Sequence, residues 1–91
     1  MSEHFDMDLT YKKTPAKRLI RMPRNRAEAI RAAIEAVAKD PFGHHPNLKP
    51  LQGMKNGFRL RVGERRVSMT IDRDTGTVEV FEIEPRGSAY R

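Results

Sequence analysis

The spacing of apolar residues changes from a helical period to a period of two near Gly57. Before that point, apolar residues recur at three- and four-residue intervals, at Ala27, Ile30, Ile34 and Val37. This is the spacing of a helix with one buried face. After that point, in the run 58–62, apolar residues alternate with arginines, which is typical of a half-buried strand. The sequence therefore predicts helices in the first half and a sheet built mainly from the second.

The first segments add a strand and a short helix. Residues 6–11 alternate between acidic or polar and apolar side chains, which predicts a strand. Thr14 followed by Pro15 has the form of a helix start, with a hydroxyl cap and then proline at the first helical position. We expect this helix to end before Pro23, because proline disfavours helical geometry at the residue before it.

A second helix follows and makes a helical hairpin with the first. Asn25 is the expected cap, and Glu28, three residues on, predicts a capping box. Asp40 and Pro41 end the helix. Residues 41–56 are interrupted by prolines and glycines and are expected to form a loop.

Three strands are expected after the loop, over 58–62, 67–71 and 77–84, with turns at 63–64 and 74–76. The last strand is apolar on both faces, which favours a central place in the sheet. The expected order is β-α-α-β-β-β. We predict a single α+β domain over residues 1–91, in which an N-terminal strand and a helical hairpin pack on an antiparallel sheet.

Charge and composition limit the classes of function. The formal net charge is +6 and the isoelectric point is about 10.2. Such an excess fits a polyanionic partner, either nucleic acid, an acidic protein or an anionic membrane face, and it fits equally a soluble basic domain with no such partner. Only 37% of the residues are hydrophobic, which suggests a core completed by a partner. No apolar run approaches the roughly 20 residues of a membrane span, and residues 1–8 lack the basic start of a secretory signal. We therefore expect a cytoplasmic protein without a membrane partner.

Metal and cofactor chemistry has little support in the sequence. Cysteine is absent, which excludes disulfides and thiolate ligands. His44 and His45 are adjacent, and adjacent side chains rarely point the same way. We expect no metal and no cofactor.

Basic residues are concentrated in the helical hairpin. Between residues 12 and 31 the only acid is Glu28, and the bases are Lys12, Lys13, Lys17, Arg18, Arg21, Arg24, Arg26 and Arg31. Such a run forms either a solvated face or a contact with RNA or an acidic protein.

Arginines also cluster on the predicted sheet. Arg59 and Arg61 share a face, because side chains repeat every two residues along a strand. Arg65 and Arg66 begin the next strand and are expected opposite them, and Arg86 follows the last strand. Converging guanidinium groups fit phosphate, although alternating arginines also occur on ordinary solvated sheets.

Three segments carry a resemblance to a known family. They are Leu48-Lys49-Pro50-Leu51-Gln52-Gly53, the run from Phe58 to Val67, and the terminus from Ile83 to Arg91. In their order and spacing they resemble the RelE/ParE toxins of bacterial type II toxin–antitoxin systems. With the strand and helices upstream, the resemblance covers roughly residues 8–91.

The resemblance implies a RelE-like fold and a toxin held by a cognate acidic antitoxin. It implies an endoribonuclease that cuts mRNA, on the ribosome in some relatives, and so inhibits translation. The catalytic positions it implies are Arg61, Arg66, Arg86 and Tyr90. We expect RNA binding by Arg59, Lys55 and Arg65.

The chain departs from the family where acid–base chemistry is needed. Arg59 and Arg61 stand where some relatives have lysine, and Pro85 stands where many have histidine. Arginine stays protonated and is a poor acid or base, which leaves Glu82 or Glu84 as the candidate base. The alternative function is therefore a non-catalytic toxin of the ParE type that inhibits DNA gyrase.

Overall fold

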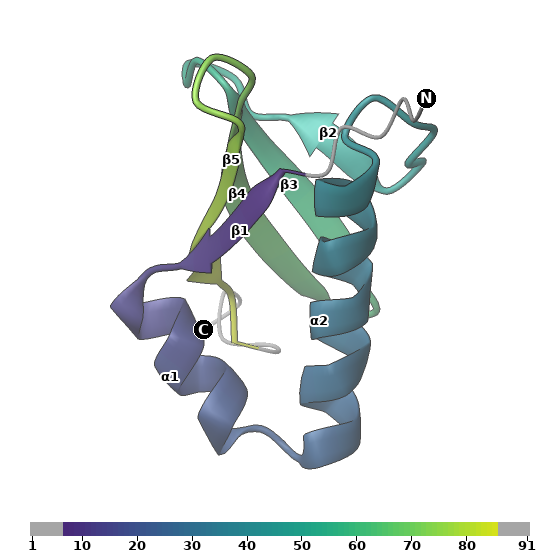
Figure 1. Ribbon diagram of the computed structural model, residues 1–91. Helices are drawn as coiled ribbons and strands as arrows, with labels where there is room; N and C mark the ends of the chain where they lie inside the picture. Colours follow the sequence, from purple (N-terminus) through teal and green to yellow (C-terminus); the bar gives the residue numbers. More distant parts are fainter. Residues whose placement is uncertain (1–6, 86–91) are drawn as a thin grey trace.

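The computed structural model describes residues 7–85, and the predicted order of helices and strands is confirmed within them. Figure 1 shows the two helices on one side of a twisted sheet. The elements are β1 (Asp8–Tyr11), α1 (Lys13–Arg21), α2 (Arg24–Lys39), β2 (Leu48–Pro50), β3 (Gly57–Val62), β4 (Arg65–Asp72) and β5 (Thr77–Ile83).

The sheet has five strands in the order β1-β5-β4-β3-β2. Strands β2 to β5 pair with antiparallel neighbours, whereas β1 pairs with β5 in parallel. The sheet is therefore mixed, because the N-terminal strand joins its edge beside β5. The expected α+β fold is confirmed, although the sheet is mixed where an antiparallel one was expected. Strand β5 is an interior strand between β1 and β4, and the central strand is β4.

Both helices begin without the side-chain caps that the sequence predicted. Helix α1 begins at Lys13, after an extended Lys12 that makes no side-chain cap. Thr14 therefore lies inside the first turn and does not cap the helix. The carbonyl of Lys12 instead accepts a hydrogen bond from the Ala16 N–H at 3.1 Å.

Helix α2 begins one residue before the predicted cap, at Arg24. Pro23 takes the cap position, and its carbonyl accepts hydrogen bonds from the N–H groups of Arg26 and Ala27, each at 3.0 Å. The capping box of Asn25 and Glu28 is therefore wrong. Glu28 instead lies 3.7 Å from Arg24 in an ion pair one turn apart.

The core lies between α2 and the sheet, as the helical spacing predicted. The four apolar residues of the α2 stripe are buried, with Ile34 fully enclosed. The sheet contributes Leu60, Val67, Met69, Ile71, Val78, Val80 and Ile83. No helix within residues 7–85 is long and apolar enough to cross a membrane.

A two-residue turn fixes the pairing of β3 with β4. Val62 pairs with Arg65, so Gly63 and Glu64 form the connection. Gly63 has a φ of +62°, a left-handed conformation that two-residue hairpins require and glycine adopts without strain. This turn sets the register that places Arg61 opposite Arg66.

The pairing of β4 with β5 contains a bulge at Phe81. Ser68 pairs with Glu82, and the next residue, Met69, pairs with Val80. The extra residue in β5 shifts the alternation, so that Val80 and Ile83 both lie in the core. Ile83, which the sequence assigned to the face opposite Val78 and Val80, thus shares their buried face.

The proline-rich segment 41–56 contains a short edge strand as well as the expected loop. Strand β2 pairs with β3 through Leu48 and Leu60. Before it, the His45 ring nitrogen Nε2 lies 2.7 Å from the carbonyl oxygen of Asp40. The segment therefore extends the sheet by one strand beyond β3.

Candidate functional site

Three of the arginines singled out in the sequence meet on the sheet face opposite the helices. Arg61 of β3 pairs with Arg66 of β4, and Arg59 lies two residues earlier on β3, on the same face. Leu60 and Val67, which pair with each other between these positions, are buried on the helix side. The two-residue alternation thus separates the cations from the core.

Lys49 joins this cluster from the edge strand β2, where it pairs with Arg59. Lys49 is not among the binding residues predicted from the sequence, because the segment 41–56, with its closely spaced prolines, was expected to form a loop. We refer to Lys49, Arg59, Arg61 and Arg66 as the basic sheet face. They line a cavity of about 320 Å³, together with Pro46, Asn47, Pro50 and Leu51.

Carboxylates border the basic sheet face on the β5 side. Glu82 pairs with Ser68, which in turn pairs with Arg59. Glu84 places a carboxylate oxygen 3.6 Å from a guanidinium nitrogen of Arg66, and its N–H donates to the Arg66 carbonyl at 2.9 Å. One row across the sheet thus runs from Lys49 and Arg59 to Glu82, and the next runs from Arg61 and Arg66 to Glu84.

The four cations of the basic sheet face differ in their exposure to solvent. Lys49 and Arg61 are exposed, whereas Arg59 and Arg66 are half-buried. The Nε atom of Arg59 is buried and has no hydrogen-bond partner in the described part of the chain. A half-buried guanidinium with an unused donor favours an anionic ligand, because such hydrogen bonds are charge-assisted.

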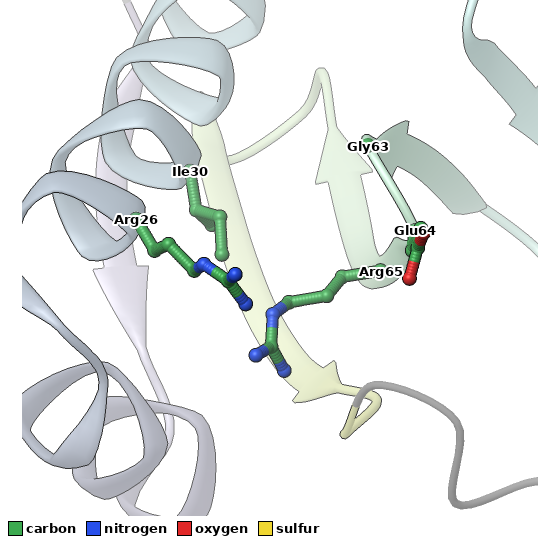
Figure 2. Close-up of a pocket in the computed structure, with 5 residues that line it drawn as sticks. All are labelled: Arg26, Ile30, Gly63, Glu64 and Arg65. Atoms are coloured by element: carbon green, nitrogen blue, oxygen red, sulfur yellow. The ribbon is translucent and has the colours of Figure 1, made fainter.

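The other predicted site residues are not on this face. Arg65 pairs with Val62, on the helix side of the sheet, and Figure 2 shows it facing Arg26 across a separate cavity. The expectation that Arg65 lies opposite Arg59 and Arg61 is wrong, because neighbouring residues on a strand point to opposite faces. Lys55 is exposed in the turn before β3. Arg86 and Tyr90 lie outside the described residues.

The arrangement can bind and polarise a phosphodiester. Guanidinium groups stabilise charge on phosphate oxygens, a carboxylate can accept a proton, and Lys49 carries a proton that it can donate. Among residues 7–85, no cluster of three histidine, aspartate or glutamate side chains is placed to hold a metal ion. The chemistry that these side chains offer is therefore phosphate binding with proton transfer.

The fold is shared with several solved toxin structures. The chain is similar to one in the archaeal RelE–RelB complex of Pyrococcus horikoshii, with a TM-score of 0.77, 17% identity, and coverage of 91% of this chain and 98% of that one. It is also similar to a chain in the RelB–RelE antitoxin–toxin complex of Methanococcus jannaschii, with a TM-score of 0.67, 25% identity, and coverage of 89% of this chain and 94% of that one. The similarity to the YoeB/ParE toxin of Agrobacterium tumefaciens has a TM-score of 0.70 at 20% identity, and it covers 86% of this chain and 96% of that one.

No protein-family model and no curated protein sequence matches the chain. Its class is nevertheless defined by the mixed five-stranded sheet with a helical hairpin on one face, which is the architecture of these small toxins. The chain has the RelE/ParE toxin fold, and the resemblance found in the sequence is confirmed.

Proposed function

We propose that this chain is the toxin of a type II toxin–antitoxin system and that it cleaves mRNA. The observation that carries the proposal is the convergence of Lys49, Arg59, Arg61 and Arg66 around one cavity with Glu84 at its border. An ordinary solvated face has no reason to place two arginines directly opposite each other, since like charges in that position are destabilising. A phosphate between them removes this cost.

The proposed reaction is a transesterification within RNA. Glu84 takes the proton of a ribose 2′-hydroxyl, and the 2′ oxygen attacks the adjacent phosphorus. The bond from phosphorus to the 5′ oxygen breaks, and that oxygen takes a proton from Lys49. The products are a 2′,3′-cyclic phosphate and a free 5′-hydroxyl. Arg61 and Arg66 stabilise the charge that develops on the phosphate oxygens.

The family resemblance supplies two further positions. Arg86 would add a cation to the same phosphate, and Tyr90 would orient or stack on a base. Arg59 and Lys55 would contact the RNA backbone on either side of the cleaved bond. The resemblance implies cleavage of mRNA on the ribosome for some members of the family, and we propose the same setting for this chain.

The proposed partner is an acidic antitoxin. The P. horikoshii and M. jannaschii structures are complexes of RelE with RelB, and this chain carries a net charge of +6. Tight binding of an acidic protein would neutralise that charge.

A second candidate function is inhibition of DNA gyrase without catalysis. It is favoured by Arg61 and Arg66, since guanidinium groups bind phosphate but do not exchange protons at neutral pH. The similarity to a YoeB/ParE toxin is compatible with both functions.

Induction in a bacterial host tests the proposal and separates the two candidates. The wild-type chain should arrest growth, stop incorporation of labelled amino acids and create new RNA ends that primer extension maps. The double variant Arg61→Gln/Arg66→Gln, expressed to the same level, should do none of these. Growth arrest with filamentous cells, continued translation and no new RNA ends would instead support the gyrase target.

A further inference from the structure

Phe81 is an aromatic residue of the sheet that the proposed reaction does not use. It is the extra residue of the β5 bulge, because Met69 pairs with Val80 and Ser68 pairs with Glu82. The side chain of Val80 is buried in the core. Since successive side chains of a strand alternate, Phe81 turns to the opposite side of the sheet. It therefore lies on the same side as the basic sheet face.

The surroundings of Phe81 agree with this placement. Its side chain is half-buried, but it does not pack against the core, whereas the half-buried rings of Tyr11 and Phe58 do. Phe42, the remaining aromatic residue of 7–85, lies in the loop after α2, where the Arg73 guanidinium is 4.5 Å from its ring centre. Among the described strands, Phe81 is thus the one aromatic residue on the side of the arginines.

The proposed reaction gives a bound RNA a direction across the sheet. The attacking 2′ oxygen and the leaving 5′ oxygen lie on opposite sides of the phosphorus, so the base and the acid must do so as well. Glu84 follows β5, whereas Lys49 lies on β2, at the far edge of the sheet. The nucleotide that supplies the 2′-hydroxyl therefore lies on the β5 side. Phe81 is on that side, three residues before Glu84.

Charge also separates the two sides of this surface. The phosphate is drawn to the arginines of β3 and β4, whereas the β5 side carries the carboxylates of Glu79, Glu82 and Glu84 beside the β4 strand. These carboxylates repel a phosphate. A nucleobase is uncharged at neutral pH and is not repelled. The backbone of a bound RNA is thus favoured over β3 and β4, and a base over β5.

We propose that Phe81 stacks on the nucleobase immediately 5′ of the cleaved bond. The proposal rests on the proposed function, and it adds a base-binding position to a site that otherwise binds phosphate. Stacking covers the apolar face of the ring and that of the base, and it is a common way in which proteins hold unpaired nucleotides. Every base has such a face. Phe81 therefore selects an unpaired nucleotide at this position and accepts any base.

Two dinucleotides with one phosphate each test the proposal on the purified full-length chain. Each has a 2′-deoxyribose on its 5′ side, so that it binds without being cleaved. The first carries adenine on the 5′ side and no base on the 3′ side, and the second carries adenine on the 3′ side only. Titrations followed by amide chemical shifts give both affinities and show whether residues 79–83 contact the ligand.

Phe81→Leu removes the ring but keeps an apolar side chain. It should weaken binding of the dinucleotide with the 5′ adenine about fivefold or more, as expected for one base stacked on an aromatic ring. Binding of the dinucleotide with the 3′ adenine should change less than about twofold. Phe81→Tyr keeps the ring and should bind both as the wild type does. Phe42→Leu is the matched control, because it removes an exposed ring elsewhere, and it should change neither affinity.

Cleavage of a DNA oligomer with one ribonucleotide gives a second measurement, since only that nucleotide has a 2′-hydroxyl to attack. Removal of the base from this ribonucleotide should raise the KM of the wild type about fivefold or more. The same removal should raise the KM of Phe81→Leu less than about twofold, because the two changes remove one shared contact. Circular dichroism checks that each variant folds.

Phe81→Leu binding that is weakened equally for both dinucleotides, or for neither, would overturn the proposal. Weakening for the 3′ adenine alone would reverse the direction of the RNA and would also contradict it. Failure of the proposed ribonuclease function gives a different result. In that case the wild type leaves the oligomer uncut, while the effect of Phe81→Leu on the dinucleotide with the 5′ adenine persists.

Discussion

Arg61 of β3 and Arg66 of β4 lie directly opposite each other on neighbouring antiparallel strands. Two like charges at opposite positions of a strand pair oppose folding. Glu84 offsets part of that repulsion, because its carboxylate lies 3.6 Å from the Arg66 guanidinium. The pair therefore lowers the stability of the folded protein when no anion is bound between the two arginines.

Arg61→Gln should raise the free energy of unfolding by roughly 0.2–1 kcal/mol, the scale of a cross-strand pair. Urea denaturation at low salt measures the change, and added salt should reduce it by screening. Arg24→Gln removes an equal charge from a solvated ion pair and should not raise stability. A destabilised Arg61→Gln protein would show that this arginine supports the sheet.

Adjacent arginines on β4 should differ sharply in their effect on RNA cleavage. Arg66 belongs to the basic sheet face, whereas Arg65 lines a separate cavity with Arg26 on the helix side of the sheet. Arg66→Gln should lower the cleavage rate on the order of 10²–10³-fold, as expected for one preorganised cation. Arg65→Gln should change the rate less than threefold. Cleavage rates of the two variants are measured on a labelled RNA, and circular dichroism checks that both variants fold. Equal losses of rate would contradict the assignment of Arg65 and Arg66 to different faces.

Glu84→Gln should change RNA binding and RNA cleavage in opposite directions. Loss of the ion pair removes one competitor of phosphate for Arg66, and a partly exposed ion pair contributes roughly 0.2–1 kcal/mol, so RNA affinity should rise about two- to fivefold. Cleavage should fall on the order of 10²–10⁴-fold, the contribution of a general base. Glu82→Gln is the matched control. If it lowers cleavage while Glu84→Gln does not, Glu82 is the base.

Tyr11→Phe should improve stability, most of all at alkaline pH. Burial raises the pKa of Tyr11 above its usual 10, and Glu35 raises it further while Arg31 opposes the shift. The Tyr11 hydroxyl is buried without a hydrogen-bond partner in the described chain. The folded state thus resists ionisation, and the stability associated with neutral Tyr11 is lost as pH rises above about 10.

The phenylalanine variant has no such group to ionise and removes the unpaired hydroxyl. We expect a gain of about 1 kcal/mol at pH 7 and a smaller loss of stability between pH 9 and pH 11. Thermal denaturation across this pH range measures both effects. The same alkaline loss in both proteins would show that another group controls it.

The sequence was sufficient to place Arg59 and Arg61 on one face, because alternation along a strand is a local property. It placed both Arg65 and Arg66 opposite them, which depends on the pairing of two strands, and only Arg66 lies there. The same alternation places Arg65 and Arg66 on opposite faces of the sheet. The expectation that Arg65 also lies opposite Arg59 and Arg61 was therefore wrong. Lys49 was not found, since strand β2 has three residues and forms only by pairing with β3. A strand this short has no periodic pattern of its own.

Long-range pairing limits prediction in the same way elsewhere. The helical spacing correctly gave the buried stripe of α2. The parallel pairing of β1 with β5, between Leu9 and Val78, joins segments far apart in the chain, and no local signal specifies it. Both predicted cap residues were wrong by two positions, because backbone carbonyls of Lys12 and Pro23 accept the hydrogen bonds assigned to the side chains of Thr14 and Asn25.

The bulge at Phe81 decides which side chains the arginines meet. If Phe81 were retained but paired regularly, strict alternation from Val78 and Val80 would turn the side chains of Glu82 and Glu84 toward the apolar interior and expose Ile83 beside Arg66. Loss of the bulge would therefore exchange a proton acceptor for an aliphatic side chain without altering any residue of the basic sheet face. In this fold, one unpaired residue in a strand sets the chemistry of the surface as firmly as residue identity does.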